Sequence, residues 1–203
     1  MKKSISLLLT AVLMLTLLCG CGKKTTATPD TDVAHSFVLF TMENGGTFKI
    51  ELYPEYAPKT VENFLGLVSE GFYDGLTFHR IVDGFMAQGG DPTIVGRSEA
   101  PSIPGEFASN GFAQNTLHHE RGVISMARTS VPDSASSQFF ICYADNAGVS
   151  NLDGSYAAFG KVIEGMETVD AFLEVERTYN GYDTSPATPV TPIVIAHAEV
   201  VDA

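Results

Sequence analysis

One arginine, Arg80, stands among apolar and uncharged polar side chains near the middle of the sequence. Its close neighbours are Phe78, His79, Phe85, Met86 and Gln88. A second group of this kind, the Ser-Gln-Phe-Phe of residues 137–140, lies far along the chain. A guanidinium is always charged and offers several N–H donors in fixed directions. These residues suit hydrogen-bond donation beside an apolar surface; the alternative is a surface arginine whose stem packs on its neighbours.

Motifs for other chemistries are absent from the sequence. There is no G-x-S-x-G, no H-E-x-x-H, no P-loop and no dinucleotide fingerprint. His118 and His119 are adjacent, which would send their side chains apart on a strand, so loop or surface histidines are favoured over a metal site. Cys19 and Cys21 have the wrong spacing for zinc. A hydrolase finds no Ser–His pair in support, and we expect neither a metal nor a cofactor.

The elements that must position these residues are predicted to be short strands with two helices. Residues 38–52 alternate apolar and polar on both sides of an Asn-Gly-Gly turn, which predicts a hairpin. Residues 58–70 begin with a proline, carry one apolar stripe and precede a glycine, as a helix would. Further strands are expected at 77–81, 85–88, 123–127, 139–143, 157–162 and 192–200, and a second helix at 166–175. This pattern favours an antiparallel barrel or sandwich.

Composition indicates a globular, acidic protein. The chain has 203 residues, of which 44% are hydrophobic and 18% charged, and its net charge is −12. Without residues 1–20, which carry Lys2, Lys3 and no acidic residue, 10 of the 12 basic residues remain against 24 acidic ones, a net charge of −14. Nucleic acid needs a basic surface, so this balance argues against it as a partner.

The N-terminus is predicted to be an export signal with a lipid attachment site. After Lys2 and Lys3, residues 5–18 form an apolar stretch that is too short for a spanning helix and typical of a signal peptide. Gly20-Cys21 then resembles a bacterial lipobox, in which the cysteine becomes the lipidated N-terminus. We therefore expect a palmitate-bearing lipoprotein, extracytoplasmic and lipid-anchored to the bacterial cell membrane. The alternative is an ordinary signal peptide with incidental cysteines.

Three segments follow from this interpretation. Residues 1–20 are the signal peptide with its lipobox, residues 21–35 the lipidated cysteine with a flexible tether, and residues 36–203 one domain. Cys142 is then the only cysteine left in the domain, within the apolar run Phe-Phe-Ile-Cys. We expect it to be a buried small hydrophobe rather than a reactive thiol.

Several blocks, in order, carry a resemblance to a known family. Residues 78–91 read FHRIVDGFMAQGGD, and they are followed by GVISMAR at 122–128 and SSQFFI at 136–141. LDG at 152–154 then leads to FGKV at 159–162. With the helix at 60–64, these blocks resemble the cyclophilin-type peptidyl-prolyl cis-trans isomerases over roughly residues 37–201. The resemblance implies an all-β fold, a closed eight-stranded antiparallel β-barrel capped by two α-helices.

The resemblance also implies a set of site residues. Arg80 would be the catalytic residue. Phe85, Met86, Phe140 and Leu152 would form a pocket for proline, Gln88 and Gln138 would line the groove, and the backbone at Ala127 and Arg128 would pair with an extended substrate. Tyr156 would stand at the rim.

Two rim positions depart from the best-known members of the family. Asn151 stands where many have Trp, and Tyr156 where many have His, and the loop at residues 143–151 is about three residues longer. These changes predict weak binding of cyclosporin.

The function implied is a peptidyl-prolyl cis-trans isomerase, or rotamase, that assists folding of exported proteins at the membrane surface. It would be a monomer whose partners are proline-containing polypeptide clients. The alternative is a proline-peptide binding module or holdase chaperone with incidental isomerase activity. Arg80 argues against that alternative, because binding alone needs only the pocket.

Overall fold

The structure, a computed structural model, describes residues 33–203. The predicted signal peptide, the lipobox and most of the predicted tether lie outside the described residues. Within residues 33–203, no helix is long and apolar enough to cross a membrane.

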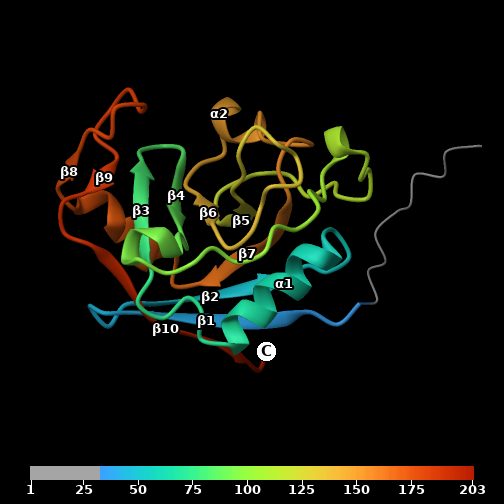
Figure 1. The fold of residues 1–203 in the computed structure, drawn as a ribbon, viewed down its shortest axis with the longest axis horizontal. Coiled ribbons are helices and arrows are strands. Elements are labelled where there is room, and N and C mark those ends of the chain that lie inside the picture. Colours follow the sequence, from blue (N-terminus) through green and yellow to red (C-terminus); the bar gives the residue numbers. More distant parts are fainter. Residues whose placement is uncertain (1–32) are drawn as a thin grey trace, which may run out of the picture.

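Eight antiparallel strands close into a barrel, which confirms the fold expected from the sequence (Figure 1). Around the barrel the strand order is β1-β10-β3-β4-β6-β5-β7-β2. The bounds are β1 Ser36–Met42, β2 Thr47–Leu52, β3 Thr77–Val82, β4 Met86–Gly89, β5 Val123–Met126, β6 Phe139–Cys142, β7 Ala158–Glu164 and β10 Ile193–Val201. Each of these strands was expected within a residue or two of its place.

The first hairpin shows how alternation builds the core. The turn between β1 and β2 contains Gly45 at φ 85°, a conformation that glycine adopts without strain. Phe40 pairs with Phe48 across the two strands, and their stacked rings lie 4.9 Å apart, fully inside the barrel. On each strand the residues next to this pair point outward, so the register of the pairing fixes which side chains form the core.

Two helices add aromatic side chains to this core. Helix α1, Pro58–Ser69, begins at its proline and is followed by Gly71 at φ 65°, as the sequence predicts. Its Phe64 packs against Phe139 and Phe159 with ring centroids 5.6 and 5.1 Å away. The second helix differs from the prediction of one helix over 166–175: α3, Met166–Asp170, changes into a 3-10 turn over Ala171–Glu174. The tighter turn, common at helix ends, carries Phe172 to 4.9 Å from Phe78.

Shorter elements in the loops were not predicted. One helical turn, α2 (Ala147–Ser150), lies in the long loop after β6, and Asn146 caps it by accepting a hydrogen bond from the Val149 N–H at 3.1 Å. Two further 3-10 turns, η1 and η2, span Pro92–Val95 and Ala108–Asn110.

A two-stranded sheet near the C-terminus was also missed. Strands β8 (Arg177–Thr178) and β9 (Thr188–Pro189) stand beside β3 at one end of the molecule (Figure 1). The N–H of Ile81 in β3 donates to the carbonyl of Ala187 at 2.7 Å, so this small hairpin is attached to the barrel wall.

Candidate active site

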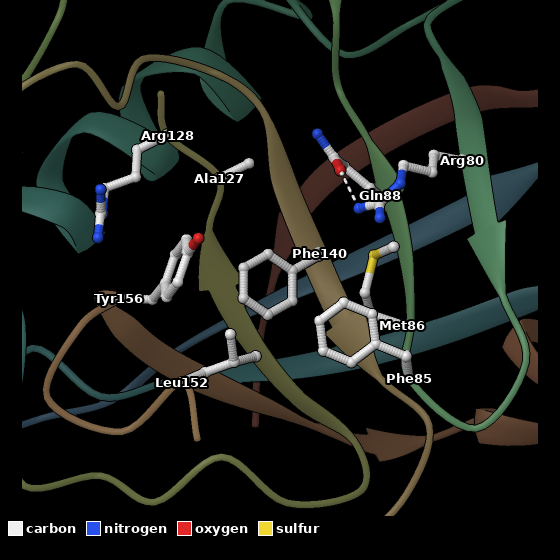
Figure 2. Close-up of a pocket in the computed structure, with 9 residues that line it drawn as sticks. All are labelled: Arg80, Phe85, Met86, Gln88, Ala127, Arg128, Phe140, Leu152 and Tyr156. Carbon is white, nitrogen blue, oxygen red and sulfur yellow. Dashed lines mark hydrogen bonds between the residues drawn. The ribbon is translucent and has the colours of Figure 1, made fainter. Parts of the chain in front are cut away.

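A pocket of about 240 Å³ lies on the outer side of the barrel wall (Figure 2). Its lining consists of Arg80, Phe85, Met86, Gln88, Ala127, Arg128, Phe140, Leu152 and Tyr156. These are nine of the ten residues that the family resemblance assigns to the site, and the tenth, Gln138, lies one hydrogen bond away. The volume is below the roughly 300 Å³ at which pockets for drug-sized ligands begin. The pocket therefore suits one side chain of a larger ligand.

Strand alternation separates this pocket from the barrel core. On β4, Ala87 belongs to the core, whereas Met86 and Gln88 face the pocket. On β6, Phe139 belongs to the core and Phe140 faces the pocket. Successive side chains of a strand point to opposite faces, and Gln88 pairs with Phe140 across the two strands. The floor of the pocket is therefore the outer face of β4 and β6.

A bulge in β3 aims Arg80 at this outer face. Phe78 pairs with Gly89 and Arg80 pairs with Gln88, so two steps along β3 pass one step along β4. In a regular strand Phe78 and Arg80 would share a face. With the bulge between them, Phe78 and Ile81 both lie in the core, and Arg80 lies outside beside Gln88. Bulges are known to redirect side chains in this way.

The apolar part of the pocket is a cup of aromatic and aliphatic side chains. Phe140 is 5% exposed and forms its base, and Phe85 is half-buried at one side. The ring of Tyr156 stands nearly perpendicular to that of Phe140, at 83° with centroids 5.8 Å apart. Figure 2 shows Met86 and Leu152 on either side of Phe140. Such a cup offers ring faces and edges to a small apolar group.

Cys142 supports the cup from below. It packs with Met86, Phe140 and Val149, it is fully buried, and within residues 33–203 it forms no disulfide. Burial raises the pKa of its thiol to about 12. The expectation of a buried cysteine at this position is confirmed, and the raised pKa disfavours the reactive thiolate.

A line of hydrogen-bonded side chains runs away from Arg80 along the groove. Nη1 of Arg80 donates to Oε1 of Gln88 at 3.3 Å, Nε2 of Gln88 donates to Oε1 of Gln138 at 2.9 Å, and Nε2 of Gln138 donates to Oδ2 of Asp91 at 3.0 Å. A guanidinium can only donate and a carboxylate can only accept. The charged groups at the two ends therefore fix the orientation of both amides between them.

The other side of Arg80 is held by a residue that the sequence did not indicate. Nε and Nη2 of Arg80 donate to the two carboxylate oxygens of Asp183 at 2.8 and 2.6 Å. This hydrogen bond raises the pKa of Arg80 above its ordinary value and lowers that of Asp183 below its own. Tyr182 lies over the guanidinium, with its ring centroid 5.7 Å from Cζ.

Arg128 organises the opposite rim. Its guanidinium lies 4.9 Å from the ring centroid of Phe107 and 4.6 Å from that of Tyr156. It also donates to the carbonyl of Ser155 at 3.0 Å from Nε and 2.8 Å from Nη2. Because the N–H of Ala127 already donates to the carbonyl of Gln138 at 2.9 Å, that N–H is occupied within the protein.

A Ser–His–Asp sequence of hydrogen bonds exists behind the pocket, which corrects the expectation that no serine is paired with a histidine. The Ser125 hydroxyl lies 3.0 Å from Nε2 of His119, and Nδ1 of His119 lies 2.8 Å from Asp153. Ser125 is fully buried. His119 lies in a loop, which is one of the two placements expected from the sequence, and it is only 3% exposed. Burial lowers the pKa of His119. A serine that no substrate can reach gives no support to a hydrolase, and the trio holds the pocket wall instead.

The chemistry open to the pocket is binding together with hydrogen-bond donation. None of the nine lining residues is a serine, cysteine, histidine or carboxylate, and Tyr156 carries the only hydroxyl among them. What it supplies is an apolar cup for one side chain with a charged donor at its edge.

Comparisons with known proteins match the whole barrel to the family that the sequence resembles. Residues 37–200 match the family described as "Cyclophilin type peptidyl-prolyl cis-trans isomerase/CLD". Peptidyl-prolyl cis-trans isomerase A of Dickeya dadantii (strain 3937) is 39% identical over 204 residues, which cover 99% of this chain and 99% of that protein. The peptidyl-prolyl cis-trans isomerase of Acinetobacter baylyi is 45% identical over 157 residues, 75% of this chain and 80% of that protein.

Solved structures with a similar fold include a member of the same family. The crystal structure of a cyclophilin type peptidyl-prolyl cis-trans isomerase from Cryptosporidium parvum has a TM-score of 0.69 and 30% sequence identity, and the match covers 84% of this chain and 99% of that one. A second crystal structure of that protein, in the presence of the dipeptide Ala-Pro, has a TM-score of 0.67 and 31% identity over 82% of this chain and 99% of that one.

Proposed function

The chain belongs to the cyclophilin-type peptidyl-prolyl cis-trans isomerases, and we propose that it acts on exported proteins at a membrane surface, with Arg80 as its catalytic residue. The enzyme rotates the peptide bond that precedes a proline. The single observation that carries the assignment of Arg80 is a charged guanidinium at the edge of an apolar pocket sized for one side chain.

The reaction needs no bond to break. Rotation about an X–Pro bond must cross ~18–20 kcal/mol, because the amide C–N bond has partial double-bond character, and it takes tens to hundreds of seconds without catalysis. The twisted transition state has lost amide resonance, so its prolyl nitrogen becomes pyramidal and accepts a hydrogen bond. A catalyst must therefore bind the twisted amide more tightly than either planar form.

Arg80 has donors left for this task. A guanidinium carries five N–H donors, and Asp183 and Gln88 together occupy three of them. One donor on Nη1 and one on Nη2 therefore remain. The prolyl nitrogen accepts a hydrogen bond only in the twisted state, so a bond from one of these donors stabilises that state and neither planar form. This is the differential binding that the reaction requires.

The pocket must share the work with Arg80. An acceleration of ~10⁵-fold needs ~7 kcal/mol at 1.36 kcal/mol per tenfold, and one charge-assisted hydrogen bond supplies only ~1.5–3 kcal/mol. The remainder has to come from excluding water and from holding the proline ring while the rest of the peptide turns. Phe85, Met86, Phe140 and Leu152 are the side chains for that purpose.

Exchange measurements on an Ala-Pro peptide test the role of Arg80. With saturating protein, NMR exchange spectroscopy reports the rate of isomerisation in the bound state. We expect Arg80→Ala to slow bound-state exchange by about 100-fold, which is about 2.7 kcal/mol, and to leave peptide affinity nearly unchanged. Arg80→Lys should restore only part of the rate, because an ammonium lacks the planar fork.

Arg97 provides the control for this experiment. It is an exposed arginine outside the pocket that donates to the carbonyls of Phe72 and Asp74. Arg97→Ala should leave both rate and affinity unchanged. The competing view of a binding module or holdase predicts that Arg80→Ala exchanges the peptide as fast as the parent protein.

The location at a membrane rests on residues 1–21. A basic start, a short apolar stretch and a Gly-Cys pair together support export and attachment of lipid at Cys21. In the cells of origin, labelling with palmitate should mark the parent protein and should fail in Cys21→Ser. Cys19→Ser should keep the label, because cleavage before Cys21 removes that residue. A label that persists in Cys21→Ser would refute the anchor.

A further inference from the structure

We propose that Asp183 is a positioning residue for the isomerase reaction, which holds the Arg80 guanidinium in the orientation that serves the twisted amide. The inference rests on the proposed role of Arg80 and concerns a residue more than 100 positions away along the chain. Asp183 touches Arg80 and does not line the pocket, so its effect on a substrate passes through Arg80.

The carboxylate of Asp183 binds the guanidinium of Arg80 side-on, through two hydrogen bonds. Oδ2 of Asp183 accepts from Nε of Arg80 at 2.8 Å, and Oδ1 accepts from Nη2 at 2.6 Å. Two parallel bonds between a guanidinium and a carboxylate fix the plane of the guanidinium as well as its place. The side chain of Asp183 is only 10% exposed and that of Arg80 22%, so the pair is partly shielded from the solvent that weakens surface ion pairs.

The carboxylate of Asp183 is itself held in place by its own loop. Nδ2 of Asn180 donates to Oδ2 of Asp183 at 2.7 Å, and Oδ1 of Asn180 accepts from the Asp183 N–H at 3.0 Å and the Tyr182 N–H at 3.2 Å. This Asx turn closes the loop between β8 and β9. The carboxylate therefore meets Arg80 from a fixed base and not from a free loop tip.

The loop is anchored to β3 immediately beside Arg80. The N–H of Ile81, the next residue, donates to the carbonyl of Ala187, and Nη1 of Arg177 donates to the carbonyl of Ile81 at 3.3 Å. Arg177 also pairs with Asp83 at the end of the same strand. Both strands of the small hairpin are thus attached to β3 at Ile81. This attachment sets the distance between Asp183 and the guanidinium of Arg80.

Such an anchor matters because an arginine side chain is long and has several rotatable bonds. Catalysis by a hydrogen-bond donor requires that the donor stand ready where the new acceptor forms, without reorganisation at the moment of reaction. Asp183 and Gln88 occupy three N–H groups and leave one on each of Nη1 and Nη2. Asp183 thereby decides which donors are left free, while Tyr182 covers one face of the guanidinium.

The test compares Asp183→Asn with a matched control at a second arginine–aspartate pair. Asn has the shape of Asp, but its amide nitrogen would meet an N–H of Arg80 donor to donor. We expect Asp183→Asn to lower kcat/KM for an Ala-Pro peptide about tenfold, with peptide affinity within about twofold of the parent. Asp170→Asn removes the carboxylate that pairs with Arg121 outside the pocket and should leave kcat/KM unchanged. Asp183→Glu, which keeps the carboxylate, should recover part of the loss.

A double variant separates positioning from a structural role. If Asp183 acts through Arg80, then adding Asp183→Asn to Arg80→Ala lowers kcat/KM no further, because the group that it positions is gone. The NMR signal of the Arg80 Nε–H should also exchange with water faster in Asp183→Asn than in the parent. The inference is overturned if Asp183→Asn keeps the parent kcat/KM, or if its loss is the same in the presence and absence of Arg80.

The outcomes also distinguish this inference from the proposal on which it rests. Loss of rate in Arg80→Ala with none in Asp183→Asn would leave Arg80 catalytic and refute only the role of Asp183. A parent rate in Arg80→Ala would refute both.

Discussion

The carboxylate of Glu106 caps helix α1 from another part of the chain: its Oε2 lies 2.8 Å from both the backbone nitrogen and the hydroxyl of Thr60. Its Oε1 accepts from the N–H of Lys59 at 3.0 Å. The residue at the N-cap position, Ala57, has no side chain that could do this. The first N–H groups of a helix need outside acceptors, and the helix dipole favours a negative charge there.

Glu106→Gln should therefore destabilise the fold. Glu106 is 3% exposed, and the amide would keep one acceptor and turn a donor toward an N–H group. We expect a loss of about 1–3 kcal/mol in the free energy of unfolding, measured by urea denaturation. Glu62→Gln is the matched control, since Glu62 is an exposed residue of the same helix that pairs with the side chain of Lys59. Equal stability of the two variants would contradict the capping role.

The pocket wall should govern binding in the ground state. Phe85 is half-buried with its ring in the pocket, so Phe85→Ala removes apolar contact from the proline ring as well as from the transition state. Losing part of the ~1.5–3 kcal/mol that a buried Phe contributes corresponds to about tenfold weaker binding. NMR titration with an Ala-Pro peptide measures it. Phe37→Ala, at a half-buried phenylalanine of β1 outside the pocket, should leave affinity unchanged; unchanged affinity in Phe85→Ala would show that the ring is no part of the site.

The rim predicts weak affinity for cyclosporin. Asn151 is exposed and offers neither the apolar face nor the N–H donor of a tryptophan, and the ring of Tyr156 is already covered by Arg128 at 4.6 Å. Calorimetric titration should give a dissociation constant in the micromolar range or weaker, and Asn151→Trp should tighten it. Nanomolar binding by the parent protein would mean that these rim positions do not control affinity.

The pKa values of two neighbouring histidines should be shifted in opposite directions, although both side chains contact Asp153. The hydrogen bond to Asp153 raises the pKa of exposed His118, and burial lowers the pKa of His119. NMR titration should find His118 changing charge above pH 6.5 and His119 below it. Asp153→Asn should lower the pKa of His118 and leave that of His197, whose partner is Asp74, unchanged.

The sign of each contribution to stability follows from these shifts. His119 has a folded-state pKa below its unfolded value, so its contribution is complete above pH 6.5 and is lost as the pH falls toward the folded-state pKa. His118 has a raised folded-state pKa, so its contribution is complete below pH 6.5 and is lost as the pH rises through that pKa. If both histidines titrated together near pH 6.5, the packing of His119 described above would be wrong.

Local pattern was enough to predict most of the strands, and the family resemblance supplied the closed barrel and the side of the site that lies on β3 and β4. Alternation fixed the first hairpin, and Arg80, Phe85 and Gln88 sit within one contiguous block whose family resemblance assigns their roles. The β3 bulge could not be predicted, because it depends on how β3 pairs with β4 and leaves no mark in the order of residue types. Asp183 was missed for a similar reason: its loop has no periodicity, and the hydrogen bonds that bring it to Arg80 form only when the barrel closes. The contact between Glu106 and Thr60 likewise joins residues 46 positions apart.

A strand at the edge of an open sheet offers unpaired N–H and C=O groups to any extended chain that comes near, and such edges promote aggregation. The barrel that residues 36–201 form is closed, so its eight strands present no edge of this kind. Each strand of the small sheet of β8 and β9 is only two residues long, and Pro189 removes a backbone donor from it. A proline-containing peptide that approaches the enzyme therefore finds no strand edge of the barrel on which it could add as a further strand. The outer face of the barrel meets such a peptide with side chains, among them those that line the pocket around Arg80.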